Sequence, residues 1–257
     1  MKNIAIELQG VSKHYTITNG WTPGLAAAQS TRVDVFENIN LNIRQGEIFV
    51  LLGPSGCGKS TLLRIMCGLE SLSQGNVNLG PGLNHRDISF VFQQFALLPW
   101  LTIEENVSLG LIARHVPEQK RKRIVTKELH QFGLNKFAHA YPRALSGGMR
   151  QRVGIARALA TNPKIIFMDE PFSELDSFTA DELRRELLLI WQKRRPTIIL
   201  VTHLIQEALT LADRIAVLTP RPTHIESIIT NPLPRPRNRR AKKFFALEDR
   251  LEAMIKP

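Results

Sequence analysis

The chain has 257 residues, with 34 lysines and arginines against 23 aspartates and glutamates, which gives a formal net charge of +11. Hydrophobic residues make up 43% and charged residues 22%, values that exclude a disordered chain and fit one large domain or one domain with an inserted lobe. The two cysteines, Cys57 and Cys67, are too few for a disulfide framework, and the first residues lack the apolar core of a signal peptide, so we expect a cytoplasmic protein.

No segment predicts a membrane span. The most apolar stretch without a charge, 88–103, has 16 residues and is interrupted by Gln93, Gln94 and Pro99. A spanning helix needs about 20 mostly apolar residues. The positive charge could instead face nucleic acid, anionic lipid or a phosphorylated ligand, and composition alone does not choose among these partners.

The N-terminal part predicts a flap followed by a loop between a strand and a helix. Alternating apolar residues in 4–8 and in 39–43 predict two half-buried strands, joined by a long loop over Thr18–Thr31 as an antiparallel flap. A short apolar run, 47–52, then ends at a glycine, and apolar residues recur at helical spacing after Lys59. The expected order is therefore strand, glycine loop, helix.

Four further apolar runs predict a parallel sheet. They are short, almost continuous and free of charge: 88–92, 165–168, 198–201 and 215–218. Strands buried on both faces of a parallel sheet have this length and continuity. Because helical stretches separate the runs, the sequence predicts an α/β fold.

Three helices are expected between the first and second of these runs. Thr102 and Glu105 form a capping box that begins one helix, a second helix covers 117–133 between a proline and a glycine, and a third covers 149–160. We therefore expect a helical lobe over 94–162, inserted into an α/β core.

The resulting division gives a main domain, 1–230, with its core in 1–93 and 163–230, and a basic C-terminal extension over 231–257. The extension contributes +5 of the net charge, because it contains eight basic and three acidic residues. These are Arg235, Arg237, Arg239, Arg240, Lys242, Lys243, Arg250 and Lys256, against Glu248, Asp249 and Glu252. The sequence gives this extension no role.

The strongest functional signal is a phosphate-binding loop. Residues 53–60 fit the pattern G-x-x-x-x-G-K-S between a predicted strand and a predicted helix. Its backbone N–H groups and the helix N-terminus would face phosphate oxygens, with Lys59 at the β/γ phosphates and Ser60 on Mg²⁺. The alternative is a glycine-rich turn with a chance lysine. The predicted nucleotide-binding residues are Gly53, Pro54, Ser55, Gly56, Cys57, Gly58, Lys59, Ser60 and Thr61.

A second signal is the acidic pair Asp169 and Glu170, at the end of the predicted strand 165–168. Ligands bind at this edge of open parallel sheets. Asp169 could hold Mg²⁺, and Glu170 could orient and partly deprotonate an attacking water. Without the phosphate loop, a structural role at the end of a strand would be as good an interpretation.

A third signal is the run Leu145–Gln151, in which Ser146, Gly147 and Gly148 stand at the start of a predicted helix. Backbone N–H groups at such a start bind anions. Taken alone, Ser146 would be better interpreted as a helix N-cap.

In order and spacing from Ile4 to Leu218, these motifs resemble the nucleotide-binding subunits of ABC transporters. The resemblance implies the ABC ATPase fold, which has a P-loop NTPase core, an antiparallel β flap and an inserted helical lobe. It also implies ATP hydrolysis with Mg²⁺, and makes 145–151 the family's signature motif. The same resemblance implies roles for single side chains: Tyr15 stacks on adenine, Gln93 contacts Mg²⁺ and the attacking water, and His203 contacts the γ-phosphate.

In this family the loop Ser173–Asp176 crosses a dimer interface, and Asp176 belongs to the nucleotide-binding set. Two copies sandwich two ATP molecules, because the signature motif of one chain completes the phosphate site of the other. This chain departs from the family pattern at Glu174, where a small residue is common, and at Leu204, where an acidic residue often follows the histidine. Without the family, Tyr15 would be interpreted as a core aromatic and His203 as a surface histidine.

The resemblance further implies separate permease subunits in the membrane, which dock near Phe95–Leu101, and an extracytoplasmic solute-binding protein. The runs 97–102, 145–152 and 233–237 are most similar to the nitrate, sulfonate and taurine importers. The competing interpretation is a soluble ATPase of the same superfamily that acts on nucleic acid or the ribosome. A single phosphate loop and the lack of sustained heptads favour the importer.

Overall fold

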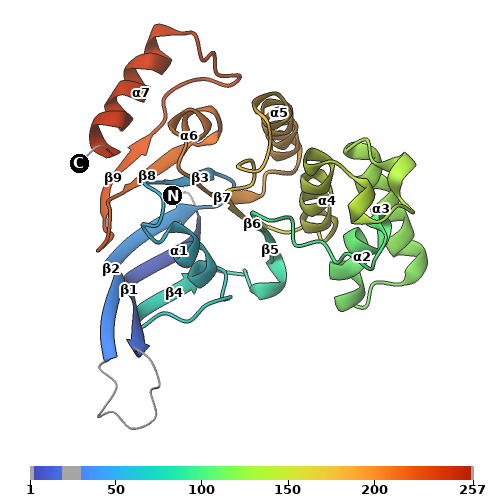
Figure 1. The fold of residues 1–257 in the computed structure, drawn as a ribbon, viewed down its shortest axis with the longest axis horizontal. Coiled ribbons are helices and arrows are strands. Elements are labelled where there is room, and N and C mark those ends of the chain that lie inside the picture. Colours follow the sequence, from blue (N-terminus) through green and yellow to red (C-terminus); the bar gives the residue numbers. More distant parts are fainter. Residues whose placement is uncertain (1–2, 19–29, 256–257) are drawn as a thin grey trace. The chain divides into compact units, whose positions relative to one another are not determined.

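The computed structural model describes residues 3–18 and 30–255. It divides the chain into two compact units, drawn with their helices and strands labelled in Figure 1. The first unit comprises Met1–Gln45, Phe49–Gly82 and Thr202–Pro257, and the second comprises Gly46–Ile48 and Leu83–Val201. The division into core, helical lobe and extension stays a prediction.

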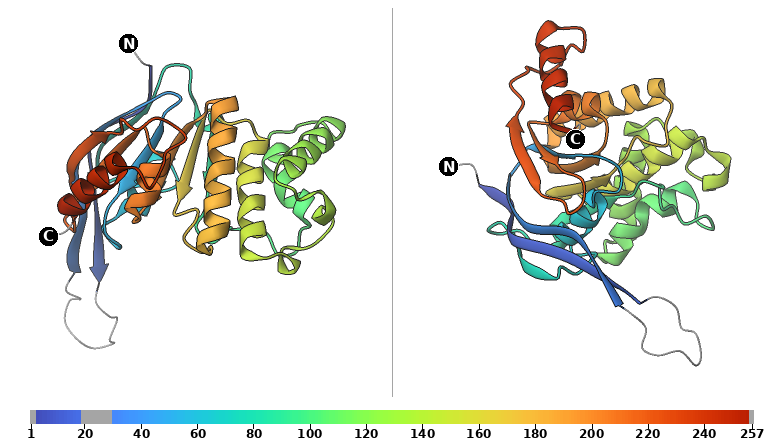
Figure 2. Two further views of the ribbon diagram at one scale, coloured as in Figure 1. Left: turned by 90° about the horizontal axis from the view of Figure 1, so that it is seen from above. Right: turned by 60° about the vertical axis from the view of Figure 1, so that its left-hand side comes forward.

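An antiparallel sheet of the first unit has the strand order β2-β1-β4. Its strands are β1 (Ile4–Thr18), β2 (Ser30–Arg44) and β4 (Gln74–Leu79). β1 pairs antiparallel with β2, with Leu8 opposite Leu41, which confirms the predicted flap. The pairing continues through polar and apolar residues as far as Thr18 and Ser30, so both strands are longer than the predicted apolar alternation. They form the long blue two-stranded ribbon in Figure 2. The rest of the predicted loop, 19–29, lies outside the described residues.

The first unit also holds β8 (Arg214–Leu218), β9 (Ile225–Thr230) and all but the first residue of β3 (Ile48–Leu52). β3 is buried along its whole length and runs parallel to β8, whereas β9 pairs antiparallel with β8. Its helices are α1 (Lys59–Met66), α6 (Ile205–Leu211) and α7 (Lys242–Ile255). The predicted order of strand, loop and helix at the phosphate loop is confirmed.

The second unit contains three parallel strands in the order β5-β6-β7. They are β5 (Ile88–Val91), β6 (Ile165–Asp169) and β7 (Thr197–Thr202), whose last residue is grouped with the first unit. Phe167 lies opposite Phe90 on one side and Ile199 on the other. β6 and β7 are buried at every position, as continuous apolar runs predict.

Four helices belong to the second unit: α2 (Ile103–Ala113), α3 (Glu118–Gln131), α4 (Gly147–Ala160) and α5 (Ser177–Arg194). Short 3-10 turns occupy His85–Asp87, Asn135–Phe137 and Pro142–Ala144. The predicted capping box is confirmed, because Thr102 N donates to Glu105 Oε2 at 2.7 Å and Glu105 N donates to Thr102 Oγ1 at 3.3 Å. α3 ends shortly before Gly133, whose φ of 66° terminates the helix.

Within the described ranges, no helix combines the length and the apolar character needed to cross a membrane. Cys57 and Cys67 are both free and buried, so neither contributes to a disulfide.

Candidate functional site

The phosphate loop of the first unit connects β3 to α1. Gly58 is the N-cap of α1 and has a φ of 102°. A Cβ atom there would lie 2.5 Å from Val35 Cγ1 of the flap, so both the backbone conformation and the packing require glycine. Thr223 Oγ1 donates a hydrogen bond to Cys57 O, which holds the loop from the side of β9. The sequence pattern alone gave no signal for this contact.

Lys59 is the first residue of α1 and is 4% exposed. Its Nζ donates to Gly53 O at 3.0 Å and to Pro54 O at 2.8 Å, so the ammonium lies against the carbonyls of its own loop. A buried cation held by neutral carbonyls gains from a nearby anion, because carbonyl dipoles compensate its lost hydration incompletely. Burial raises the pKa of the Cys57 thiol, so this loop residue stays protonated at neutral pH and is a poor nucleophile.

Tyr15 lies beside the C-terminal end of the phosphate loop. Its hydroxyl donates to Glu70 Oε1, and the Thr61 side chain also hydrogen-bonds this hydroxyl. Burial, together with the bond and the charge of Glu70, raises the Tyr15 pKa. Lys13 Nζ lies 4.7 Å from the ring centroid and forms an ion pair with Glu70 at 3.2 Å. The ring is 40% exposed, so it is not a core aromatic, and adenine stacking stays a prediction.

In the second unit the acidic pair lies where the sequence predicts it. Asp169 is the last residue of β6 and is 2% exposed. Glu170 follows with a φ of 42°, a left-handed conformation that is uncommon for a residue other than glycine. Its N–H donates to Val201 O of β7 at 3.2 Å, which fixes the backbone. Such strain is found mainly at functional sites.

Gln93 and Glu170 are connected through Ser173. Gln93 Nε2 donates to Ser173 Oγ at 3.3 Å, and Ser173 Oγ donates to Glu170 O at 3.0 Å. The segment after β5 is thereby tied to the loop after β6. The structure therefore brings together Gln93, Glu170 and the loop Ser173–Asp176, as the predicted site requires. The bridging role of Ser173 had no signal in the sequence.

The signature residues begin α4. Ser146 is its N-cap and accepts a hydrogen bond from Met149 N at 3.4 Å, which confirms the capping interpretation. A Cβ atom on Gly148 would lie 2.5 Å from Thr179 Cγ2 in the first turn of α5, so glycine allows the two helix starts to meet. Anion binding by Ser146, Gly147 and Gly148 stays a prediction.

Asp176 is the N-cap of α5. Its Oδ1 accepts hydrogen bonds from Phe178 N at 3.1 Å and Thr179 N at 3.0 Å, and these bonds lower its pKa. The structure thus gives Asp176 a structural task, and its nucleotide contact stays a prediction. His203, the remaining site residue, belongs to the first unit, where it is exposed directly after β7.

The segment after Gln93 is strained and held by α4. Phe95 and Ala96 have φ values of 53° and 46°. Arg157 donates to both of their carbonyls, from Nη2 to Phe95 O at 3.0 Å and from Nη1 to Ala96 O at 2.7 Å. The Arg150 guanidinium lies 5.3 Å from the Phe95 ring centroid. We call Arg157 with Phe95 and Ala96 the arginine clamp. In the sequence, the arginine clamp is indicated only by a charged residue between two alanines, and the structure buries both alanines in α4.

Replacing Arg157 with alanine is expected to destabilise the protein by about 2 kcal/mol, the value of hydrogen bonds made by a charged donor. The loss also releases the strain at Phe95 and Ala96, so it should loosen the segment beside Gln93. Chemical denaturation measures the free energy of unfolding, with the exposed Arg123→Ala as the matched control. Equal stability of the two variants would show that the clamp contributes nothing.

The expected magnesium ligands suit the metal chemically. Magnesium prefers oxygen ligands and is usually held by one or two carboxylates together with phosphate oxygens and water. Asp169, Gln93 and Ser60 supply such oxygens, with Asp169 as the carboxylate. Among residues 3–18 and 30–255, no group of three or more His, Cys, Asp or Glu side chains forms a metal site made by protein alone. Mg²⁺ binding by these side chains stays a prediction.

Comparison with protein families matches residues 36–173 to the family described as ABC transporter. An uncharacterised ABC transporter ATP-binding protein of Methanocaldococcus jannaschii is 45% identical over 88% of this chain and 85% of its own length. The aliphatic sulfonates import ATP-binding protein of Bacillus subtilis is 43% identical over 84% of this chain and 85% of its own length. The nitrate import ATP-binding protein of a Synechocystis strain is 40% identical over 87% of this chain and 89% of its own length.

Among solved structures, a similar chain is an ATP-binding cassette in a dimeric post-hydrolysis state, bound to ADP and phosphate. It is 35% identical, with a TM-score of 0.74, and the match covers 88% of this chain and 98% of that one. Because the match covers 88% of this chain, the similarity extends over both compact units.

Proposed function

Because this chain belongs to the ABC transporter family and is an ATP-binding subunit with ATPase activity, we propose that it powers the uptake of a small solute through separate membrane subunits. The names of its sulfonate and nitrate relatives support a solute of the nitrate, sulfonate or taurine type. The observation that carries the proposal is the hydrogen-bonded connection from Gln93 through Ser173 to Glu170. It links the residues expected to sense and activate water.

In the proposed reaction, the chain contributes positioning and electrostatics. Lys59 exchanges its bonds to Gly53 O and Pro54 O for phosphate oxygens, and the Glu170 carboxylate accepts a proton from the attacking water. His203 donates a hydrogen bond to the γ-phosphate. Asp169, Ser60 and Gln93 would hold Mg²⁺, which would supply neutralisation of the charge on the phosphates.

We propose a homodimer as the active form. Lys59 lies in the first unit and Ser146 begins a helix in the second, so each chain carries two separate anion-binding features. The solved relative with ADP and phosphate is a dimer, which supports pairing of two copies around nucleotide. Binding of ATP would close this dimer, and loss of the γ-phosphate would open it.

The proposed permease contact is Phe95–Leu101, which includes the two residues held by Arg157 and ends shortly before α2. Trp100 is 69% exposed, which is unusual for a side chain of this size. Asn106 supports the segment from inside: its Nδ2 donates to Leu98 O and Leu101 O, both at 3.1 Å. A rigid segment with an exposed aromatic suits docking on a membrane subunit. The chain would then lie peripherally at the cytoplasmic face of the membrane, alongside an extracytoplasmic solute-binding protein.

The alternative, an ATPase acting on nucleic acid or the ribosome, has weaker support. The named relatives in the comparisons are import proteins. Eight of the 34 basic residues that invited this alternative lie in the C-terminal extension, where three arginines are engaged in contacts with α6.

Removal of divalent metal tests the proposed function directly. We expect the purified chain to release phosphate from ATP in the presence of Mg²⁺, and to lose at least about 90% of that rate in excess EDTA, because metal provides several kcal/mol of charge stabilisation. Adding back Mg²⁺ should restore the rate. Hydrolysis that continues unchanged in EDTA would contradict the proposed roles of Asp169 and Ser60.

A further inference from the structure

Residues 231–239, between β9 and α7, cross the C-terminal end of α6. We call this segment the C-terminal strap. Its residues alternate: Pro232, Pro234 and Pro236 are exposed, whereas Arg235 and Arg237 are partly buried. Proline has no N–H to satisfy, so the exposed proline positions leave no backbone donor without a partner, while the arginine side chains are half-buried. Nothing in the proposed reaction uses them.

The strap completes the hydrogen bonds of α6. The last four carbonyls of a helix have no partner within the helix. In α6 the first of these, Ala208 O, accepts from Ala212 N at 2.9 Å. The other three accept from strap side chains: Leu209 O from Asn231 Nδ2 and Arg237 Nη1, Thr210 O from Arg237 Nη1, and Leu211 O from Arg235 Nη2.

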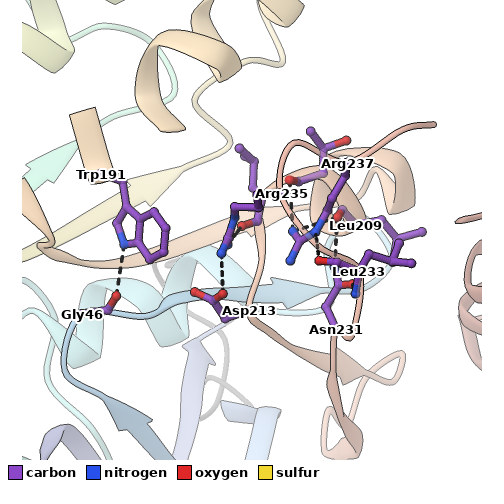
Figure 3. Close-up of polar contacts among 10 residues, drawn as sticks. Gly46, Trp191, Leu209, Asp213, Asn231, Leu233, Arg235 and Arg237 are labelled. Carbon is purple, nitrogen blue, oxygen red and sulfur yellow. Dashed lines mark hydrogen bonds and ion pairs between the residues drawn. The ribbon is translucent and has the colours of Figure 1, made fainter. Parts of the chain in front are cut away.

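Two arginines anchor the strap in this position (Figure 3). Arg237 Nη1 donates at 2.9 Å to Leu209 O and at 3.0 Å to Thr210 O, and its Nε donates at 3.2 Å to Leu233 O of the strap itself. Arg235 forms an ion pair with Asp213, the residue before β8. Burial and the charge of Arg235 lower the pKa of Arg237 to about 10, so it remains cationic at neutral pH and complements the negative end of the helix dipole.

The opposite end of α6 begins at Ile205, two residues after His203. Leu204 N donates to Thr202 Oγ1 at 3.0 Å, and α6 has no side-chain N-cap. His203 therefore stands on a short connection between the end of β7 and a helix of only seven residues. Such a short helix is not stable by itself, so its position depends on what holds it from outside. The strap holds the C-terminal end of α6 through its hydrogen bonds to the last three carbonyls of the helix.

We propose that the C-terminal strap positions His203 by fixing α6, with Arg237 as the principal positioning residue. The inference rests on the proposed contact between His203 and the γ-phosphate. It gives the basic extension a role in the ATPase reaction, through protein structure and without contact to nucleic acid or lipid.

A double-mutant cycle tests the inference. We measure kcat and the KM for ATP of the full chain, of Arg237→Ala, of His203→Ala and of the double variant, with rates normalised to sites that bind a fluorescent ATP analogue. Arg237→Ala should lower kcat about tenfold and change KM less than about twofold, since a distant mutation that misplaces a reacting group costs up to about 100-fold. In the His203→Ala background, adding Arg237→Ala should lower kcat by less than about twofold.

Two further variants separate positioning from folding. Arg240→Ala removes an exposed positive charge next to the strap and should keep the kcat of the unmodified chain. Arg237→Lys keeps the charge but lacks the planar fork, so its kcat should lie between that of the unmodified chain and that of Arg237→Ala. If the alanine variant fails to fold, a kcat of Arg237→Lys below that of the unmodified chain still tests the inference.

The outcomes distinguish the inference from the proposed function. An unmodified kcat in folded Arg237→Lys and Arg237→Ala would overturn the inference, whatever their melting temperatures. An equal loss from Arg237→Ala with and without His203 would also overturn it, because the strap would then act elsewhere. A chain that hydrolyses no ATP, or a fully active His203→Ala, would instead overturn the proposed function.

Discussion

The substitution Glu170→Gln is expected to lower ATP turnover by at least about 100-fold, the usual contribution of a general base. Glutamine has nearly the same shape as glutamate but does not accept a proton from water. The backbone of residue 170 is held by the bond from its N–H to Val201 O and by the bond from Ser173 Oγ to its carbonyl, so neither contact depends on the side-chain charge. ATP binding should therefore survive.

Phosphate release and size-exclusion chromatography with ATP together measure this effect. The variant should accumulate as a dimer, because it binds ATP and does not remove the γ-phosphate. Glu226→Gln, at an exposed position of β9, is the matched control and should retain turnover and the monomer–dimer balance of the unmodified chain. Unchanged hydrolysis by Glu170→Gln would remove this carboxylate from the mechanism.

The substitution Lys59→Ala should act at the binding step. It deletes the ammonium that lies against Gly53 O and Pro54 O at the mouth of the phosphate loop. Hydrogen bonds to a charged group are worth about 1.5–3 kcal/mol, so the Kd for ATP should rise between about 10-fold and 100-fold. Hydrolysis at a fixed ATP concentration should fall accordingly.

Titration with a fluorescent ATP analogue measures the affinity, and circular dichroism confirms that the variant is folded. The exposed Lys136→Ala removes the same charge from the surface and should bind ATP as the unmodified chain does. Normal affinity in folded Lys59→Ala would contradict the assignment of the phosphate loop. The two substitutions thus separate the steps, since Glu170 affects turnover and Lys59 affects affinity.

The elements predicted from sequence are those whose own residues carry the pattern. β3, β6 and β7 are continuous apolar runs, and the structure buries each of them completely. β4 and β9 were not anticipated. β4 is largely polar, and almost all positions of both strands are exposed or half-buried, so their conformation comes from pairing with β1 and β8. Local sequence does not record which strand a polar segment will join.

The same distinction holds at the candidate site. The loop that contains Lys59 was predicted because phosphate chemistry fixes residue types at close spacing. The clamp of Arg157 on Ala96 connects residues 61 apart, and the bond from Gln93 to Ser173 connects residues 80 apart. Neither contact produces a local sequence pattern. Phe95 and Ala96 adopt left-handed conformations without being glycine, so their residue types do not predict these conformations.

α7 shows an intermediate case. Phe244 and Leu251 are buried and stand seven residues apart on one helical face, a spacing visible in the sequence. Because many charges surround them, the sequence predicted a basic extension without an assigned role. Its helix forms because these two side chains pack on the first unit, where α7 lies against α6 and β8.

The central claim is that this ATPase serves a membrane permease. The most direct test is affinity purification of the tagged chain from gently solubilised membranes of its host, with mass spectrometry of the proteins that accompany it. We predict recovery of a multi-spanning permease, and its loss when the exposed Trp100 of the docking segment is replaced by glutamate. Recovery of ribosomal or DNA-bound proteins without any membrane partner would contradict the claim and leave only the ATPase.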